Sequence, residues 1–309
     1  MAHLAPDTVD LSIVLCTYNM HRELPRTLCT LSRAYQRYAQ GIRFEVIIVD
    51  NGSDKTADDS RWVDLGCSNV DYLYVPRGDP SPCRILNQGI ARAHGRLVAV
   101  MIDGARMLSP GVFHLAMLAG AMHDRPVICT HGFHLGPELQ ARSIANGYNQ
   151  AAEDALLASV DWQHNGYRLF EISVFAGSSY RGWLVSPNES NCLILPRKFL
   201  GELGGFDERF VTPGGGLANL DLFQRACQSR GAQLVTLLGE GTFHQIHGGA
   251  AANSSAPNPN EAFDQEYERL RGQRFQTITH DSILIGRPNP STAQLLEQSA
   301  RLLRNQPHP

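Results

Sequence analysis

The chain has 309 residues, of which 43% are hydrophobic and 18% charged, and its formal net charge is −3. This length suits one large α/β domain or two small ones, and the composition is that of a globular protein with a sizeable core. A small negative charge without a basic tract gives no electrostatic basis for binding nucleic acid.

Strands and helices alternate in the first third of the chain. Runs that are apolar on both faces predict buried strands at 11–18, 44–50, 70–75 and 97–103, and the stretches between them predict helices at 24–38, 55–65 and 84–93. This alternation is typical of a mostly parallel sheet covered by helices. Ligands bind such sheets beyond the carboxyl ends of the strands, where Thr17, Asn19, Asp50, Asn51 and Asp103 are expected.

The remainder of the chain is less regular. It predicts strands at 126–133, 170–177, 192–196 and 232–239, and helices at 140–159, 219–229, 261–270 and 292–305. Small and polar residues fill 248–260, and this composition disfavours packed structure. We therefore expect one domain over residues 1–249, followed by a flexible loop and a C-terminal helical extension over residues 250–309.

Four motifs follow one another in a specific order. They are SIVLCTYN, EVIIVDNGSDKT, NQGIARAHGRLVAVMIDGARMLSPG, and GELGGFDERF with the glycine-rich turn and LDLFQRA behind it. Over about residues 11–230 this order resembles the family 2 glycosyltransferases with the GT-A fold. The resemblance implies an α/β, Rossmann-like, mostly parallel central sheet flanked by helices. It also implies a nucleotide-binding half at about 10–110 and a variable acceptor half at about 111–249.

The resemblance implies an enzyme that moves a sugar from a nucleotide-sugar donor, UDP-linked in most members, to an acceptor hydroxyl. The acceptor would be a saccharide, a lipid-linked molecule or a small molecule, the cofactor would be Mn²⁺ or Mg²⁺, and the configuration at the sugar would be inverted. Neither the donor sugar nor the acceptor can be read from the residues.

The resemblance also implies which residues hold the donor. Thr17, Tyr18 and Asn19 would line the nucleotide pocket, Asp50 would bind the base, Arg84 and Asn87 would lie near the ribose and phosphates, and Asp103 would open the DxD motif that binds ribose and metal. Taken alone, Asp50 before Asn-Gly-Ser is an ordinary turn initiator. Tyr18 is equally well explained by packing at the rim, whereas a helix cap is the less favoured interpretation of Asp103.

The metal site departs from the family pattern, because Ala105 stands where DxD has its second acid. Hard cations need oxygen or imidazole ligands, and family members often place a histidine after the last core strand. His244 and His247 in GTFHQIHGG lie there. Positions three apart on a strand face opposite sides, so at most one would reach the cleft unless the chain turns. We expect Asp103 with His244 or His247 as the metal ligands.

Four further residues have more than one interpretation. The second HxxH pair, His131 and His134, is interpreted as structural or as part of the acceptor side. Glu240 caps a turn or joins the site, the former being preferred. Asp207 in GGFDERF is a turn residue or a neighbour of the acceptor.

The catalytic base also departs from the family, because Ala218 and Asn219 occupy the positions of the acidic pair that deprotonates the acceptor. Three explanations stay open. Asp221 is the base, although it lies on another face of its helix and could instead complement the helix dipole. Alternatively, Glu189 is the base, or the enzyme retains configuration and needs none.

Two other classes of protein share features with this sequence. Loss of the second DxD acid and of the acidic pair is what a non-catalytic nucleotide-sugar-binding relative would show. A nucleotidyltransferase ranks low, because CTYNMHRELPR lacks the glycines of a triphosphate-binding loop.

The compartment is indicated by the cysteines and by the absence of apolar segments. Seven cysteines, odd in number and without a CxxC spacing, argue against a zinc knuckle and a disulfide framework. The N-terminal residues do not resemble a signal peptide, and no apolar run is long enough to span a membrane. We therefore expect a cytoplasmic location without a transmembrane segment.

Overall fold

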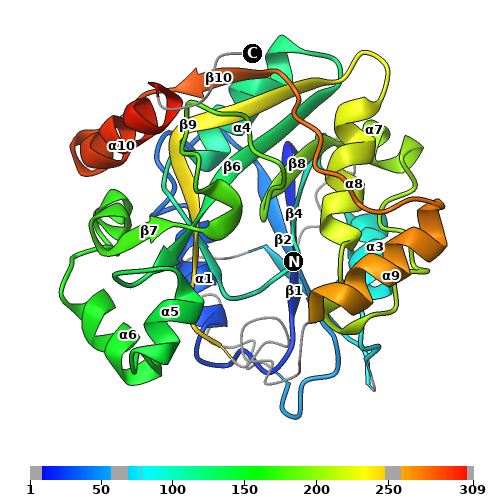
Figure 1. The fold of residues 1–309 in the computed structure, drawn as a ribbon, viewed down its shortest axis with the longest axis horizontal. Coiled ribbons are helices and arrows are strands. Elements are labelled where there is room, and N and C mark those ends of the chain that lie inside the picture. Colours follow the sequence, from blue (N-terminus) through cyan, green and yellow to red (C-terminus); the bar gives the residue numbers. More distant parts are fainter. Residues whose placement is uncertain (1–8, 57–68, 77, 248–258, 305–309) are drawn as a thin grey trace.

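A computed structural model describes residues 9–56, 69–76, 78–247 and 259–304. One sheet organises this fold, with strand order β10-β9-β6-β8-β4-β1-β2-β3, and β5 and β7 pair with β9 and β6 (Figure 1). The strands are β1 (Leu11–Thr17), β2 (Phe44–Asp50), β3 (Val70–Tyr74), β4 (Leu97–Met101), β5 (Arg106–Leu108), β6 (Pro126–Leu135), β7 (Ser173–Phe175), β8 (Leu193–Pro196), β9 (Gln233–His244) and β10 (Ser282–Gly286).

Most pairs in this sheet are parallel. β1 pairs in parallel with β2 and β4, β2 with β3, and β9 with β6 and β10. β8 runs antiparallel to both β4 and β6, and it thereby joins the two parallel groups. The carboxyl ends of β1, β2 and β4 therefore meet at one edge of the sheet.

Helices cover both faces of the sheet. They are α1 (Leu24–Leu31), α3 (Cys83–Arg92), α4 (Val112–Met122), α5 (Gln140–Ala145), α6 (Gln150–Ala158), α7 (Arg197–Glu202), α8 (Ala218–Gln228), α9 (Pro259–Arg271) and α10 (Ala293–Arg304). Successive residues of β1 belong to different core clusters: Leu15 to the cluster that includes residues of α1 and α4, and Val14 to the cluster that includes residues of α3, α7, α8 and α9. Burial on both faces explains the continuous apolar runs, and the predicted mostly parallel α/β sheet is confirmed.

Several predicted elements differ from the structure. The helix predicted at 24–38 ends at Leu31, where the chain enters turns. The helix predicted at 140–159 is two helices, because Gly147 has a φ of +91° and Asn149 caps α6 by accepting from the Ala152 amide. The strand predicted at 170–177 is a 3₁₀ turn followed by the short β7.

The C-terminal residues pack on the body of the domain. Tyr267 of α9 lies in the core beneath α3, α7 and α8, and Leu295 of α10 lies in an aromatic cluster with Trp183 and Phe243. β10, which was not predicted, adds a parallel edge strand to β9. The helix predicted at 55–65 lies, from residue 57 on, outside the described residues, and so does the predicted loop up to residue 258.

In the part of the chain that the structure describes, no helix combines the length and the apolar character needed to cross a bilayer. The six cysteines in the same part are all free thiols.

Candidate functional site

Polar residues meet at the edge of the sheet where β1 and β2 end. Thr17 and Asp50 are paired in register on these strands. The buried Asp50 carboxylate accepts hydrogen bonds from the Ser53 amide at 2.8 Å and from the Tyr72 hydroxyl at 2.6 Å. Asn19, whose φ is +51°, donates its amide N–H to Ser53 Oγ at 2.8 Å. These bonds join the loop after β1 to the loop after β2, and the two loops form one surface. Asp50 initiates the turn in the second of these loops.

Asp103 follows β4 and is held in a tight turn. Its Oδ1 accepts a hydrogen bond from the Ala105 amide at 2.8 Å. A side chain at Gly104 would come within 2.9 Å of the Cys16 carbonyl oxygen, so only glycine fits between Asp103 and the end of β1. Ala105 is fully buried. The position of the missing second acid is thus part of the core.

Two imidazoles lie beside Asp103 instead of a second acid. His244 Nε2 lies 2.9 Å from Asp103 Oδ2 and 3.0 Å from His247 Nε2, and the latter lies 3.3 Å from the same carboxylate oxygen. Ligand atoms about 2.1 Å from one ion and at right angles to each other are separated by about 3.0 Å. The three atoms therefore have the spacing of one face of a metal coordination shell, and their chemistry suits a divalent cation.

His244 is oriented as a metal ligand requires. Its Nδ1 donates to Gln140 Oε1 at 2.6 Å, which leaves the lone pair on Nε2 facing Asp103. Burial and the charge of Arg106 lower the pKa of His244 to about 4, against the opposing effect of Asp103. His244 is therefore neutral near pH 7, the form that binds metals.

The pKa values of the other two groups of this trio, Asp103 and His247, are shifted in opposite directions. Burial alone would raise the pKa of Asp103, but the hydrogen bonds and charges of His244 and His247 hold it well below its usual range. Burial would lower the pKa of His247, but Asp103 outweighs it and raises that pKa. The trio thus contains an ionised carboxylate that attracts positive charge, either a proton on His247 or a bound cation.

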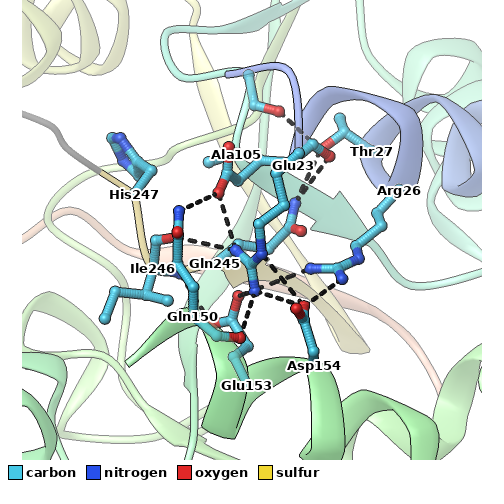
Figure 2. Close-up of polar contacts among 12 residues, drawn as sticks. Glu23, Arg26, Thr27, Ala105, Gln150, Glu153, Asp154, Gln245, Ile246 and His247 are labelled. Atoms are coloured by element: carbon cyan, nitrogen blue, oxygen red, sulfur yellow. Dashed lines mark hydrogen bonds and ion pairs between the residues drawn. The ribbon is translucent and has the colours of Figure 1, made fainter. Parts of the chain in front are cut away.

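Both histidines reach Asp103 because the strand ends between them. β9 stops at His244, and residues 245–247 leave the strand geometry. The Gln245 amide donates to the Ala105 carbonyl at 2.9 Å, and the Ile246 amide donates to Glu153 Oε2 at 2.8 Å. Figure 2 shows this segment beside α6, with His247 at its end. The turn that the sequence argument required for a double histidine site is present.

Arg106 is a site residue that was not predicted. It is paired with His244 in the register of β5 and β9, so both side chains project from the same face of the sheet. Its Nε lies 3.6 Å from Asp103 Oδ2, and its Nε and Nη1 are buried without a hydrogen-bond partner. Burial lowers the pKa of Arg106, whereas the charges of Asp103 and Glu189 oppose that shift. The sequence did offer one signal for Arg106, because this arginine directly follows Ala105, the position of the missing second acid.

Glu189 and Asp221, the two candidate bases, have different surroundings. Glu189 is half-buried, and its charge opposes the lowering of the Arg106 pKa. Asp221 is buried, and its oxygens accept from Arg225 Nε at 2.7 Å and from Arg271 Nε at 2.6 Å. Asp221 therefore serves an ion-pair network between α8 and α9, and these contacts do not support its prediction as the base.

The other predicted residues have contacts within the fold. Arg84 pairs with Asp79 at 2.7 Å. Asn87 bonds the backbone of Phe206 through both its amide atoms, each at 2.9 Å. Asp207 accepts from the backbone amide of Arg209 at 3.0 Å, as expected for a turn residue, and also from the Arg271 guanidinium at 2.8 Å. Roles for Arg84 and Asn87 at the donor stay predictions.

Of the other residues with two interpretations, His134 lies at the site, whereas His131 and Glu240 support the fold. The imidazole of His134 lies 5.9 Å from that of His244, so it borders the site. His131, on the opposite face of β6, packs against Phe175 and is structural. Glu240 accepts from the Gly111 amide at 3.0 Å where α4 begins, which confirms its capping role.

Comparisons with known proteins agree with this geometry. Residues 12–155 match the family model described as Glycosyl transferase family 2. Crystal structures of Staphylococcus aureus TarS are similar in fold. TarS 1-349 in complex with UDP-GlcNAc has a TM-score of 0.53 and 14% identity, over 84% of this chain and 67% of that one. TarS 1-349 in complex with UDP has a TM-score of 0.51 and 13% identity, over 85% and 70%.

The match to the longer TarS chain has a TM-score of 0.50 and 13% identity; it covers 85% of this chain but only 43% of TarS. No protein of curated function matches the sequence. The chain shares the fold of these TarS structures, and its polar site lies beyond the ends of β1, β2 and β4. The match to the Glycosyl transferase family 2 model covers residues 12–155, and this part of the chain includes Asp50 and Asp103 of the site.

Proposed function

We propose that the chain is a metal-dependent glycosyltransferase that moves a sugar from a UDP-linked donor to an acceptor hydroxyl with inversion. The observation that carries the proposal is the trio of Asp103, His244 and His247, whose ligand atoms lie 2.9 to 3.3 Å apart. A divalent cation there would supply positive charge for the diphosphate leaving group. Mn²⁺ or Mg²⁺ is the proposed ion.

The donor site is proposed for the joined loops beside this trio. Thr17, Asn19 and Asp50 border it, and Tyr18, 54% exposed, offers a ring to a base. The TarS complexes with UDP and UDP-GlcNAc support a uridine donor. Asp50 can bind the base while it keeps its bonds to Ser53 and Tyr72, because each carboxylate oxygen has a second lone pair.

Arg106 supplies positive charge that can stabilise the diphosphate as it leaves. The unpartnered nitrogens of Arg106 lie beside Asp103, where they can donate to phosphate oxygens. Buried, preorganised donors stabilise developing negative charge more strongly than groups in water do. Arg106 thereby compensates in part for a site that has one carboxylate instead of two.

We assign the base to Glu189 ahead of Asp221. In an inverting transfer the base takes the proton of the acceptor hydroxyl while that oxygen attacks the anomeric carbon and the diphosphate leaves. The charge of Glu189 acts on Arg106, and Asp221 is held by two guanidinium groups. A saccharide, a lipid-linked molecule or a small molecule is the proposed acceptor class. The free thiols support the proposed cytoplasmic location.

Calorimetry of UDP binding with and without Mn²⁺ tests this proposal. We expect Mn²⁺ to raise the affinity of the wild-type protein for UDP about tenfold or more. D103N keeps an oxygen for the Ala105 amide but loses the charge, so it should lose this gain, while D207N, a matched change in the α8–α9 network, should keep it. An undiminished gain in D103N would contradict the assignment of the metal site.

A further inference from the structure

The proposed ligand His247 lies beyond the end of β9, so something other than the sheet must fix its position. The preceding residue, Ile246, is bound at both of its backbone polar groups. Its amide donates to Glu153 Oε2 at 2.8 Å, and its carbonyl accepts from Arg22 Nη1 at 3.2 Å. These two bonds fix the peptide groups on either side of Ile246, including the one that carries the His247 nitrogen.

Arg22 and Glu153 also bind each other. Arg22 Nη2 donates to Glu153 Oε1 at 3.1 Å, which closes a ring of three contacts through Ile246. Glu153 is fully buried. Figure 2 shows Glu153 directed from α6 towards the Ile246–His247 segment. A buried carboxylate is costly unless all its oxygens are satisfied, and here one oxygen binds the guanidinium and the other the backbone before the ligand.

This ring connects three parts of the site that are distant in sequence. Arg22 belongs to the loop after β1 that carries Tyr18 and Asn19, and Glu153 belongs to α6 in the second half of the chain. Arg22 is held further by Glu23 at 2.8 Å and by Asp154 at 2.7 Å. The donor loop, α6 and the metal-ligand segment are therefore fixed relative to one another by a single guanidinium.

We propose that Arg22 and Glu153 are positioning residues that hold His247 in place for the cation. This inference rests on the proposed metal dependence. Groups behind metal ligands that orient them commonly contribute 10–100-fold to metal affinity. Asp154 provides a matched control, because it binds Arg22 and Arg26 from the same helix but its bonds go to these arginines and not to Ile246.

Titration with Mn²⁺ alone, followed by the electron paramagnetic resonance of the free ion, tests the proposal. In E153Q the amide can accept from only one of its two donors and turns its NH₂ group towards the other. We expect E153Q to weaken Mn²⁺ binding about tenfold and D154N to change it less than twofold. UDP affinity measured without metal should be unchanged in both variants.

A double-mutant cycle separates positioning from general destabilisation. If Glu153 acts through His247, then E153Q/H247A should bind Mn²⁺ no more weakly than H247A. Should E153Q not fold, R22K, which keeps the charge but cannot span the same acceptors, should lose about threefold or more in Mn²⁺ affinity.

Wild-type Mn²⁺ affinity in both E153Q and R22K, or an additive loss in the double variant, would overturn the inference and leave the proposed function standing. A wild-type protein that does not bind Mn²⁺ would overturn both.

Discussion

At the scale of single residues, the chemistry depends on which carboxylate is free to accept a proton. Asp221 has both oxygens engaged in charged hydrogen bonds with Arg225 and Arg271, so its carboxylate is occupied within the fold. Glu189 is half-buried and lies in the field of Arg106, which is itself beside Asp103. The two acids are thus matched in charge and differ in availability.

E189Q is expected to lower kcat about 10²–10⁴-fold while UDP affinity with Mn²⁺ stays within about twofold, because the substitution removes the base and leaves the trio intact. D221N is expected to lower the unfolding temperature and to leave most of the transfer rate, since it breaks the bonds between α8 and α9. Transfer kinetics and thermal unfolding of both variants check this. Full loss of transfer in D221N, with E189Q active, would reverse the assignment; a product of retained configuration would remove the need for a base.

The trio shows what sequence could predict at this scale. The placement of Asp103 after a buried strand and of two histidines after the last core strand predicted a common site, and the three residues do meet. Which histidine would be used could not be predicted, because it depends on bonds that Ile246 makes with Arg22 and Glu153, 224 and 93 residues away. Arg106 went unpredicted for the same reason, since its environment comes from β9 and Glu189.

At the scale of elements, Glu240 is the residue that joins β9 to α4. Its buried carboxylate accepts from the Ser109 hydroxyl, the Gly111 amide and the Tyr167 hydroxyl. α4 begins at Val112, so two of these donors lie at its N-terminus, where a helix leaves amides without partners. Glu240 thus anchors the helix that covers one face of the sheet.

This environment gives a pH dependence of stability. Burial raises the pKa of Glu240 to about 7 from its ordinary 4.5. The folded protein therefore holds a proton here that the unfolded chain releases, so the stability from this group is complete below pH 4.5 and is lost as the pH rises through about 7. E240Q does not titrate.

We expect the unfolding free energy of E240Q, relative to wild type, to rise by about 1 kcal/mol or more from pH 5 to pH 8. Denaturant unfolding at the two pH values measures it. A difference between the proteins that does not change with pH would contradict a buried, titrating Glu240.

Elements were predictable where burial alone decides them. β1, β2 and β4 are buried on both faces, and their apolar runs predicted them to within two residues. The break between α5 and α6 depends on the left-handed backbone of Gly147 within a stretch of helical periodicity. β10 is a partly exposed edge strand, and its apolar run of Ile283, Leu284 and Ile285 is too short to indicate a strand.

At the scale of the whole molecule, the fold brings together parts of the chain that have no local relation. Asp103 and His244 are 141 residues apart, and they meet because β4 and β9 direct their ends to the same edge of the sheet. The parallel arrangement could be predicted from the alternation of strands and helices, and with it the location of the site. The antiparallel β8 between the two groups could not, because its four residues carry no mark of direction.

The central claim, that one cation is bound by residues from both ends of this domain, is tested most directly by anomalous scattering from Mn²⁺ in crystals grown with UDP. The account predicts a single strong peak within about 2.3 Å of Asp103 Oδ2 and of both Nε2 atoms of His244 and His247, in contact with the diphosphate. A peak that excludes both histidines, or UDP bound with no peak beside Asp103, would contradict it.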